Sequence, residues 1–154
     1  MRDIEELVRN IKKYSKVIIQ KKLKSKKNTV AYVTISSKPR ILKWFIPGLQ
    51  KNLQREYEVL KNSQKQLQVP FVFEIDKKNN ILILNYITGD NLCDLLNDKN
   101  IIFSEKERLV NLLAQWYITF HNHFKKENEF KIHGDATLRN FIFNSCIFFF
   151  LLVH

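Results

Sequence analysis

Four runs rich in β-branched and aromatic residues, joined in pairs by short polar turns, constrain the fold of this chain most. Residues 29–35 and 40–45 form the first pair, and residues 69–75 and 81–87 form the second. Runs of this length, bounded by turn residues, predict two antiparallel hairpins. The run 81–87 is apolar almost throughout, which predicts a central strand rather than an edge strand.

Apolar residues at helical spacing predict helices before, between and after these hairpins. The 3.6-residue period is present over 3–19, 49–66 and 104–124, and a short helix is expected to start over 91–96. Asp3 is the expected N-cap of the first helix. The basic run 20–28 is typical of a solvated turn and less often of a phosphate or nucleic-acid contact. The expected fold class is therefore α+β.

The composition indicates a folded protein with anionic partners. The chain has 154 residues, 45% of them hydrophobic, with 12 Phe but only 3 Gly and 3 Pro. That is enough apolar side chain for one core and argues against disorder. The net charge of +11 favours nucleotides, nucleic acid or anionic lipid head groups as partners. A general bias toward Lys, Asn and Ile explains the same charge equally well.

Two cysteines and two termini bear on the compartment. Cys93 and Cys146 follow no metal-ligand spacing, so buried free thiols are the simplest interpretation, with a disulfide left open. Residues 1–7 do not have the pattern of a signal peptide. The apolar stretch 141–153 is shorter than the roughly 20 residues that a membrane-spanning helix needs. We therefore expect a cytoplasmic protein with no membrane span.

Polar side chains with chemical potential gather in the segment 131–144. His133, Asp135 and Asn140 stand there between apolar runs. A carboxylate such as Asp135 can accept a proton from an attacking hydroxyl, and the amide oxygen of Asn140 can bind a divalent metal that carries phosphates. The alternative is that Asp135 and Asn140 only cap a turn between a helix and a hairpin, because both residue types are common in turns.

The pattern His133-Gly-Asp135-(four residues)-Asn140 resembles the catalytic loop of the protein-kinase-like superfamily. The Gly after the His points to the branch of aminoglycoside and choline phosphotransferases and the small atypical kinases. The resemblance implies that Asp135 is the catalytic base and Asn140 a Mg²⁺ ligand. The resemblance also implies that His133 supports the loop by hydrogen bonding and that Arg139 could contact phosphate.

Other parts of the same pattern occur upstream, in the order that the resemblance implies. Lys43, in the run 40–45, would bind the α and β phosphates of ATP, although an edge-strand Lys turned to solvent is the ordinary alternative. In the helix 49–66, Glu56 would pair with Lys43, with Glu58 as second choice and a surface Glu as the alternative.

The end of the run 81–87 is similar to a kinase hinge. There the backbone of Asn85, Tyr86 and Ile87 would bind adenine, and Leu84 would face the back of the pocket. The resemblance covers about residues 25–150. It implies a small nucleotide-binding lobe of antiparallel strands with one helix over 1–85, and an incomplete, mainly helical large lobe over 86–154. The implied function is ATP-dependent transfer of the γ-phosphoryl group to a hydroxyl, with ATP and Mg²⁺ as cofactors.

The sequence departs from the family at two places. No glycine stands in 25–29, where family members usually have glycines that let backbone amides approach the phosphates. No carboxylate follows Asn140, although the family has a second metal-binding Asp there. The end of the chain therefore resembles a truncation or a shifted reading frame. We expect weak or no catalysis, because charge on the transferred group would be poorly neutralised.

Three alternatives stay open from the sequence. His121, His123 and His133 with Asp135 could form a metal cluster, but residues two apart on a helix point to different faces. The basic charge allows a nucleic-acid-binding or scaffold module instead of an enzyme. A partner-binding pseudokinase is the third possibility. The hydroxyl-bearing acceptor, whether protein or small molecule, is not identified by any motif.

Overall fold

The computed structural model describes residues 3–23, 25, 28–125, 137–144 and 147–150. These residues form two compact units. The first contains residues 3–61 and 71–86, and the second contains residues 62–70 and the described part of 87–152.

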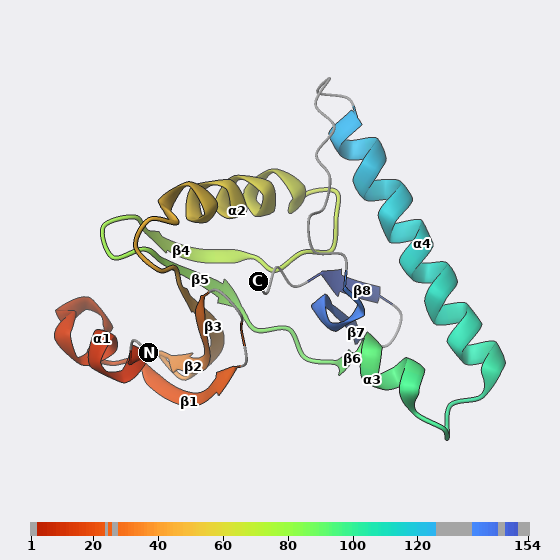
Figure 1. The fold of residues 1–154 in the computed structure, drawn as a ribbon, viewed down its shortest axis with the longest axis horizontal. Coiled ribbons are helices and arrows are strands. Elements are labelled where there is room, and N and C mark those ends of the chain that lie inside the picture. Colours follow the sequence, from red (N-terminus) through yellow and green to blue (C-terminus); the bar gives the residue numbers. More distant parts are fainter. Residues whose placement is uncertain (1–2, 24, 26–27, 126–136, 145–146, 151–154) are drawn as a thin grey trace. The chain divides into compact units, whose positions relative to one another are not determined.

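The first unit contains a five-stranded antiparallel sheet, in the order β1-β2-β3-β5-β4 (Figure 1). Its strands are β1 (Ile18–Leu23), β2 (Thr29–Ile35), β3 (Lys38–Trp44), β4 (Val72–Asp76) and β5 (Ile81–Asn85). The two predicted hairpins are β2–β3 and β4–β5, so both are confirmed. The interior position of β5 is also confirmed: it pairs with β3 and β4, and residues 81–84 are buried.

The predicted helix over 3–19 is wrong in its second half. Helix α1 (Ile4–Asn10) ends early, a 3-10 helix (Lys12–Tyr14) follows, and Ile18 already belongs to β1. The helix leaves its path at Ile11, whose φ and ψ are −104° and 105°. The β-branched Ile18 and Ile19 pair with β2 instead, so tertiary pairing overrides the helical period. Part of the predicted basic turn is therefore the exposed edge strand β1.

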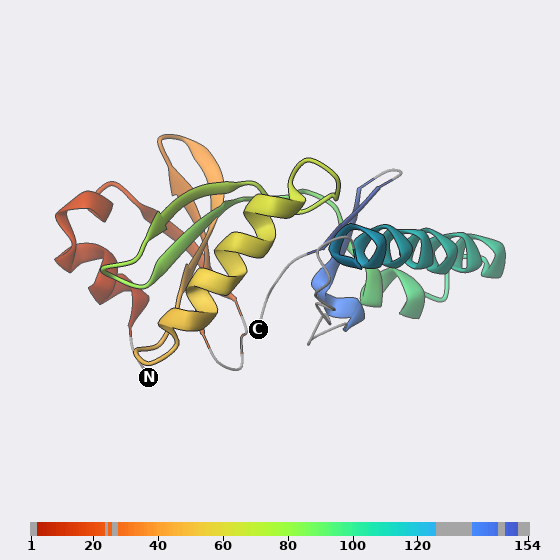
Figure 2. The same cartoon turned by 90° about the horizontal axis from the view of Figure 1, so that it is seen from above.

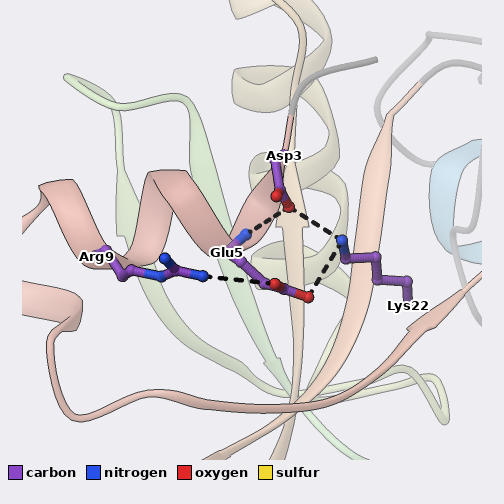
Figure 3. A network of polar contacts seen from close by, with 4 residues as sticks. All are labelled: Asp3, Glu5, Arg9 and Lys22. Carbon is purple, nitrogen blue, oxygen red and sulfur yellow. Dashed lines mark hydrogen bonds and ion pairs between the residues drawn. The ribbon is translucent and has the colours of Figure 1, made fainter.

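Charged side chains join α1 to β1 (Figure 3). The carboxylate of Asp3 accepts hydrogen bonds from the Glu5 backbone N–H at 3.0 Å and from Lys22 Nζ at 3.0 Å. Glu5 forms ion pairs with Lys22 at 3.2 Å and with Arg9 at 3.7 Å. These hydrogen bonds lower the pKa of Asp3 and raise that of Lys22. The predicted N-cap role of Asp3 is confirmed.

The two faces of the sheet are covered differently. On one face, Ile4, Val8 and Tyr14 pack against alternate residues of the strands, including Val33, Leu42 and Ile83. Helix α2 (Gln50–Ser63) lies along the other face (Figures 1 and 2) and buries Leu53, Glu56 and Leu60. It is shorter than the predicted 49–66. Because strand side chains alternate, Val30, Ile41, Lys43, Leu82 and Leu84 share the α2 face.

The second unit places a long helix beside a small sheet. Its elements are β6 (Asp90–Asn91), α3 (Leu92–Asn97), α4 (Phe103–Lys125), a 3-10 helix (Leu138–Asn140), β7 (Phe141–Asn144) and β8 (Ile147–Phe150). The sheet order is β6-β7-β8, and β7 and β8 form an antiparallel hairpin after Asn140. Trp116 and Tyr117 of α4 contact the ring of Phe141, with centroids 5.4 and 5.7 Å apart.

Cys93 has a free thiol and is half-buried, so it is less enclosed than predicted, whereas Cys146 lies outside the described residues. Among the helices that the structure describes, none is long and apolar enough to cross a membrane.

Candidate functional site

Lys43 and Glu56 form a buried ion pair in the first unit. Lys43 Nζ lies 2.6 Å from Glu56 Oε2, and the two residues are only 1% and 6% exposed. Lys43 comes from β3 and Glu56 from the face of α2 that covers the sheet. Glu58, the second choice for this partner, is exposed and accepts a hydrogen bond from Gln54 instead. The structure therefore brings Lys43 together with Glu56.

The position of Lys43 excludes an ordinary surface lysine. Strand β3 lies between β2 and β5, so Lys43 is not on an edge strand, and its ammonium also lies 5.1 Å from the centre of the Phe45 ring. Removing two charges from water is costly, and a close, hydrogen-bonded partner is needed to offset the cost. A fold that maintains such a pair holds one ammonium in a fixed direction inside an apolar surface.

Apolar side chains surround Lys43 on its face of the sheet. Val30 and Leu82 are its cross-strand partners on β2 and β5. Two residues along, Ile41 pairs with Tyr32 and with Leu84, which is 4% exposed. Apolar side chains beside one ammonium are the kind of lining that suits a ligand with an aromatic base and an anionic end. Leu84 thus shares a face with Lys43.

The predicted hinge residues lie at the end of β5 and directly after it. The Asn85 backbone N–H donates to Phe71 O at 2.9 Å, so this N–H is already used within the sheet. An adenine contact through the Asn85 N–H would break that bond. Tyr86 is 40% exposed, and its ring contacts Tyr32 with centroids 4.7 Å apart. Ile87 belongs to the second unit.

Asn140 is anchored in the second unit, whereas Asp135 and His133 lie outside the described residues. Asn140 is 4% exposed, and its backbone N–H donates to Thr137 O at 2.9 Å. The neighbouring carbonyl of Arg139 accepts a hydrogen bond from Asn91 Nδ2 at 2.7 Å. Asn91 also caps α3 through Cys93 N–H, so one side chain fixes two segments. Sequence reasoning missed this anchor, although Asn before a helix is a recognisable cap.

Two of the three histidines of the predicted cluster, His121 and His123, lie in the described part of the chain. His123 Nδ1 contacts Gln66 Oε1 by a hydrogen bond, and the His121 ring stacks near Tyr117 with centroids 6.3 Å apart. In the part of the chain that the structure describes, no group of three or more His, Cys, Asp or Glu side chains could hold a metal. His133 and Asp135 are not in that part.

Comparisons with known proteins agree with a kinase-like fold. No protein-family model matches the sequence. Over 117 residues the chain is 28% identical to the KEOPS complex subunit Bud32 of Pyrococcus abyssi, a match that covers 71% of this chain and 50% of Bud32. The solved structure of the kinase PK-1 of Cydia pomonella granulovirus matches with a TM-score of 0.63 and 19% identity. That match covers 96% of this chain and 57% of PK-1.

These matches confirm the resemblance to the protein-kinase-like superfamily and the predicted α+β fold class, and they leave the branch undistinguished. The chain spans about half the length of the curated relative it matches.

Proposed function

We propose that this chain, whose fold is that of the protein-kinase-like superfamily, binds Mg²⁺-bound ATP and acts as an ATP-dependent phosphotransferase toward a hydroxyl. The observation that carries the proposal is the buried pair of Lys43 and Glu56 on an apolar sheet face. The Lys43 ammonium is already buried and paired with one carboxylate before any ligand binds. It can therefore donate a hydrogen bond to phosphate oxygens without a new cost of removing its charge from water.

In this proposal, each residue of the candidate site has a role that fits its chemistry. Lys43 binds phosphate, Glu56 keeps the Lys43 ammonium oriented, and the face that carries Leu84 receives the base. The backbone of Tyr86 and Ile87, beyond the committed Asn85 N–H, provides hydrogen bonds to the edge of adenine. Asp135 accepts the proton of the attacking hydroxyl.

The side chain of Asn140 fits a magnesium ligand, because it is a buried amide that offers an oxygen, the donor that Mg²⁺ prefers. When bound, the ion would neutralise charge on the phosphates. Asn140 would act with Asp135, five residues before it, in holding the metal-bound nucleotide and the acceptor. The acceptor itself is a hydroxyl compound of unassigned class.

The test is binding of Mg²⁺·ATP measured by titration calorimetry on the whole chain. We expect Lys43→Met to weaken binding at least tenfold, since a hydrogen bond between charged groups is lost. Lys38→Ala is the matched control, because Lys38 is on the same strand and carries the same charge but is exposed. Equal binding by wild type and Lys43→Met, or no binding by wild type at millimolar nucleotide, would overturn the proposal.

Catalysis is tested separately from binding. Asp135→Asn is expected to keep affinity for Mg²⁺·ATP while abolishing any transfer of labelled γ-phosphoryl to the chain itself or to added hydroxyl acceptors. Transfer that is unchanged in Asp135→Asn would remove Asp135 from the role of base. Binding without any transfer in the wild type would leave a nucleotide-binding protein and not an enzyme.

A further inference from the structure

Two exposed aromatic side chains of the first unit lie near an arginine. Phe71, directly before β4, and Phe73, in β4, are 58% and 50% exposed. The guanidinium of Arg40 on β3 lies over the Phe73 ring, with its carbon 4.6 Å from the ring centre. We call Arg40, Phe71 and Phe73 the Arg40 patch. The nucleotide site proposed above uses none of these three residues.

The strand register places the patch on the face of the sheet opposite α2. Arg40 pairs with Asn85 of β5, and the Asn85 N–H donates to Phe71 O at 2.9 Å, so these residues form one row across the sheet. Strand side chains alternate, so Arg40 points away from the α2 face, to which its neighbour Ile41 belongs. Helix α1 and the 3-10 helix cover this face farther along the strands, where Leu42 is buried. The two Phe side chains nevertheless stay exposed.

An irregularity in β4 sets the position of Phe73. Val72 pairs with Leu84 and Glu74 pairs with the adjacent Ile83, so Phe73 is an extra residue in β4 that has no partner on β5. A bulge of this kind redirects a side chain, and bulges are features that the sequence encodes. Because a bulge also distorts the edge that another strand would need for pairing, Phe73 suits a side-chain contact better than strand addition.

Arg40 has hydrogen-bonding capacity that the described residues do not use. Its Nη1 donates to Pro39 O at 3.0 Å, but among the residues that the structure describes no carboxylate pairs with the guanidinium. A guanidinium has five N–H donors, and a carboxylate can accept two of them at once. The patch therefore combines a cation that lacks a carboxylate partner with exposed aromatic surface.

From these observations we infer that the Arg40 patch binds an acidic segment of a partner protein, with a carboxylate on Arg40 and an apolar side chain against Phe71 and Phe73. Arg and aromatic side chains are the residue types that contribute most to binding at protein interfaces. The net charge of +11 attracts an acidic partner over distance. A nucleic acid fits less well, because it needs several cations in a row, whereas Glu74 and Asp76 follow Phe73 on the same strand.

The test uses random peptides displayed on phage, selected on the whole chain and counter-selected on Arg40→Gln. We expect the enriched peptides to combine carboxylates with aliphatic or aromatic side chains. One enriched peptide is then synthesised with a fluorescent label, and its affinity is measured by anisotropy. Arg40→Gln and Phe73→Ala should each weaken binding of this peptide at least about tenfold, as expected for central residues of an interface.

Two variants are matched controls. Lys78→Gln removes one exposed positive charge from the turn between β4 and β5, and Phe103→Ala removes an exposed ring from α4. Both should keep the wild-type affinity for the peptide. Arg40→Gln and Phe73→Ala should also keep the wild-type affinity for Mg²⁺·ATP, so a failure of this inference is distinguishable from a failure of the proposed function.

Several outcomes would overturn the inference. Enrichment of no peptide on the wild type would mean that the patch binds no acidic segment, and equal losses in Arg40→Gln and Lys78→Gln would show attraction by overall charge alone. Displacement of the peptide by polyuridine RNA but not by polyglutamate would assign the patch to nucleic acid. A sedimentation coefficient that falls in Phe73→Ala without any peptide would assign it to contact between copies of the chain.

Circular dichroism checks that each variant folds. If Arg40→Gln or Phe73→Ala does not fold, Phe71→Ala provides the test, because Phe71 is exposed and lies outside β4. This variant should also weaken the labelled peptide about tenfold. Wild-type affinity in a folded Phe71→Ala would then contradict the inference.

Discussion

The ion pair of Lys43 and Glu56 gives a stability prediction at the scale of single residues. In Lys43→Met the apolar stem is kept, but the Glu56 carboxylate loses its 2.6 Å partner in a buried site. We expect the free energy of unfolding to fall by about 3–5 kcal/mol, as when one member of a buried pair is removed. Urea denaturation followed by circular dichroism measures the change.

The control is the double variant Lys43→Met with Glu56→Leu. Because two apolar side chains need no charge compensation, this variant should regain most of the lost stability. It is also a well-folded control for nucleotide binding. A Lys43→Met variant as stable as the wild type would contradict the inference that the buried Glu56 carboxylate needs a charged partner.

Tyr14 gives a second prediction at the residue scale. Its hydroxyl lies 2.8 Å from Glu74 Oε1 and 2.9 Å from Asp76 Oδ2. Burial is the larger cause of the raised pKa of Tyr14, and these two contacts raise it further. Tyr14→Phe keeps the ring in the core and removes the hydroxyl. We expect a loss of about 1–2 kcal/mol in the free energy of unfolding at pH 7, measured by urea denaturation.

The same variant should change the response to acid. Burial alone would raise the pKa of Asp76, but hydrogen bonds from Asn79 and Tyr14 hold it below 3.8. A folded pKa below the unfolded value stabilises the protein above pH 3.8, and that stabilisation is lost as the pH falls through the folded value. The fall in melting temperature over this window should be smaller in Tyr14→Phe. An identical acid profile would remove Tyr14 from this role.

Individual residues differ in how far the sequence reveals them. Lys43 and Glu56 could be paired from sequence because a strand Lys and a helix Glu stood in the order that a known pattern requires. Their burial fixes the pair in the structure. Asn91 was recognisable as a helix cap, but its hydrogen bond to the Arg139 carbonyl could not be found that way, because it depends on which atoms lie nearby after folding. Asp135 lies outside the described residues, so its role stays a prediction.

At the scale of elements, Gly89 controls how β6 meets β7. Its φ is +145°, and a Cβ there would lie 2.4 Å from Phe143 O and 2.7 Å from Ile142 Cγ2. Backbone oxygen cannot move away as a flexible side chain can, so Gly89→Ala should separate the two strands. We expect a loss of about 2–4 kcal/mol in the free energy of unfolding, measured by thermal denaturation.

Gly48 provides the matched comparison. Its φ is +92°, but a Cβ there would meet no atom within 4 Å. Gly48→Ala should therefore show only the cost of a strained backbone, about 1–2 kcal/mol. Equal effects of the two substitutions would mean that the close approach to β7 contributes nothing.

Elements were predictable where local pattern and tertiary contact agree. The hairpins β2–β3 and β4–β5 were found because alternating burial and turn residues act over short distances. The segment 3–19 was not, because its apolar residues fit a helix as well as a strand. The choice was made by a partner strand: Ile18 and Ile19 pair with Thr34 and Val33, a long-range contact that no local pattern contains.

At the scale of the whole molecule, charge separates the two classes of function. A nucleic-acid binder with net charge +11 should lose affinity steeply with salt, with a slope set by the number of phosphates contacted. A site built on one buried ammonium should bind Mg²⁺·ATP with a much shallower slope. The sequence could supply the charge but not its distribution, which depends on which lysines are paired, as Lys22 is with Asp3 and Glu5.

Exposed apolar side chains on α4 predict self-association of this chain. Phe103, Val110 and Ile118 are 80%, 48% and 60% exposed and recur every two turns, so they lie along one side of the helix. Apolar side chains aligned on one exposed side of a helix favour contact with another apolar surface. We expect a sedimentation coefficient that rises with concentration for the wild type, and a constant monomer value for the double variant Val110→Gln, Ile118→Gln.

The double variant should change the melting temperature little, because surface substitutions usually shift stability by less than about 0.5 kcal/mol. Leu109→Gln, next to Val110 but 1% exposed, is the contrasting variant: it should lower the melting temperature strongly. If the double variant associates as the wild type does, α4 is not the contact surface. If the melting temperature of the double variant falls as far as that of Leu109→Gln, Val110 and Ile118 contribute to the core. They would then not form a contact surface for a second copy of the chain.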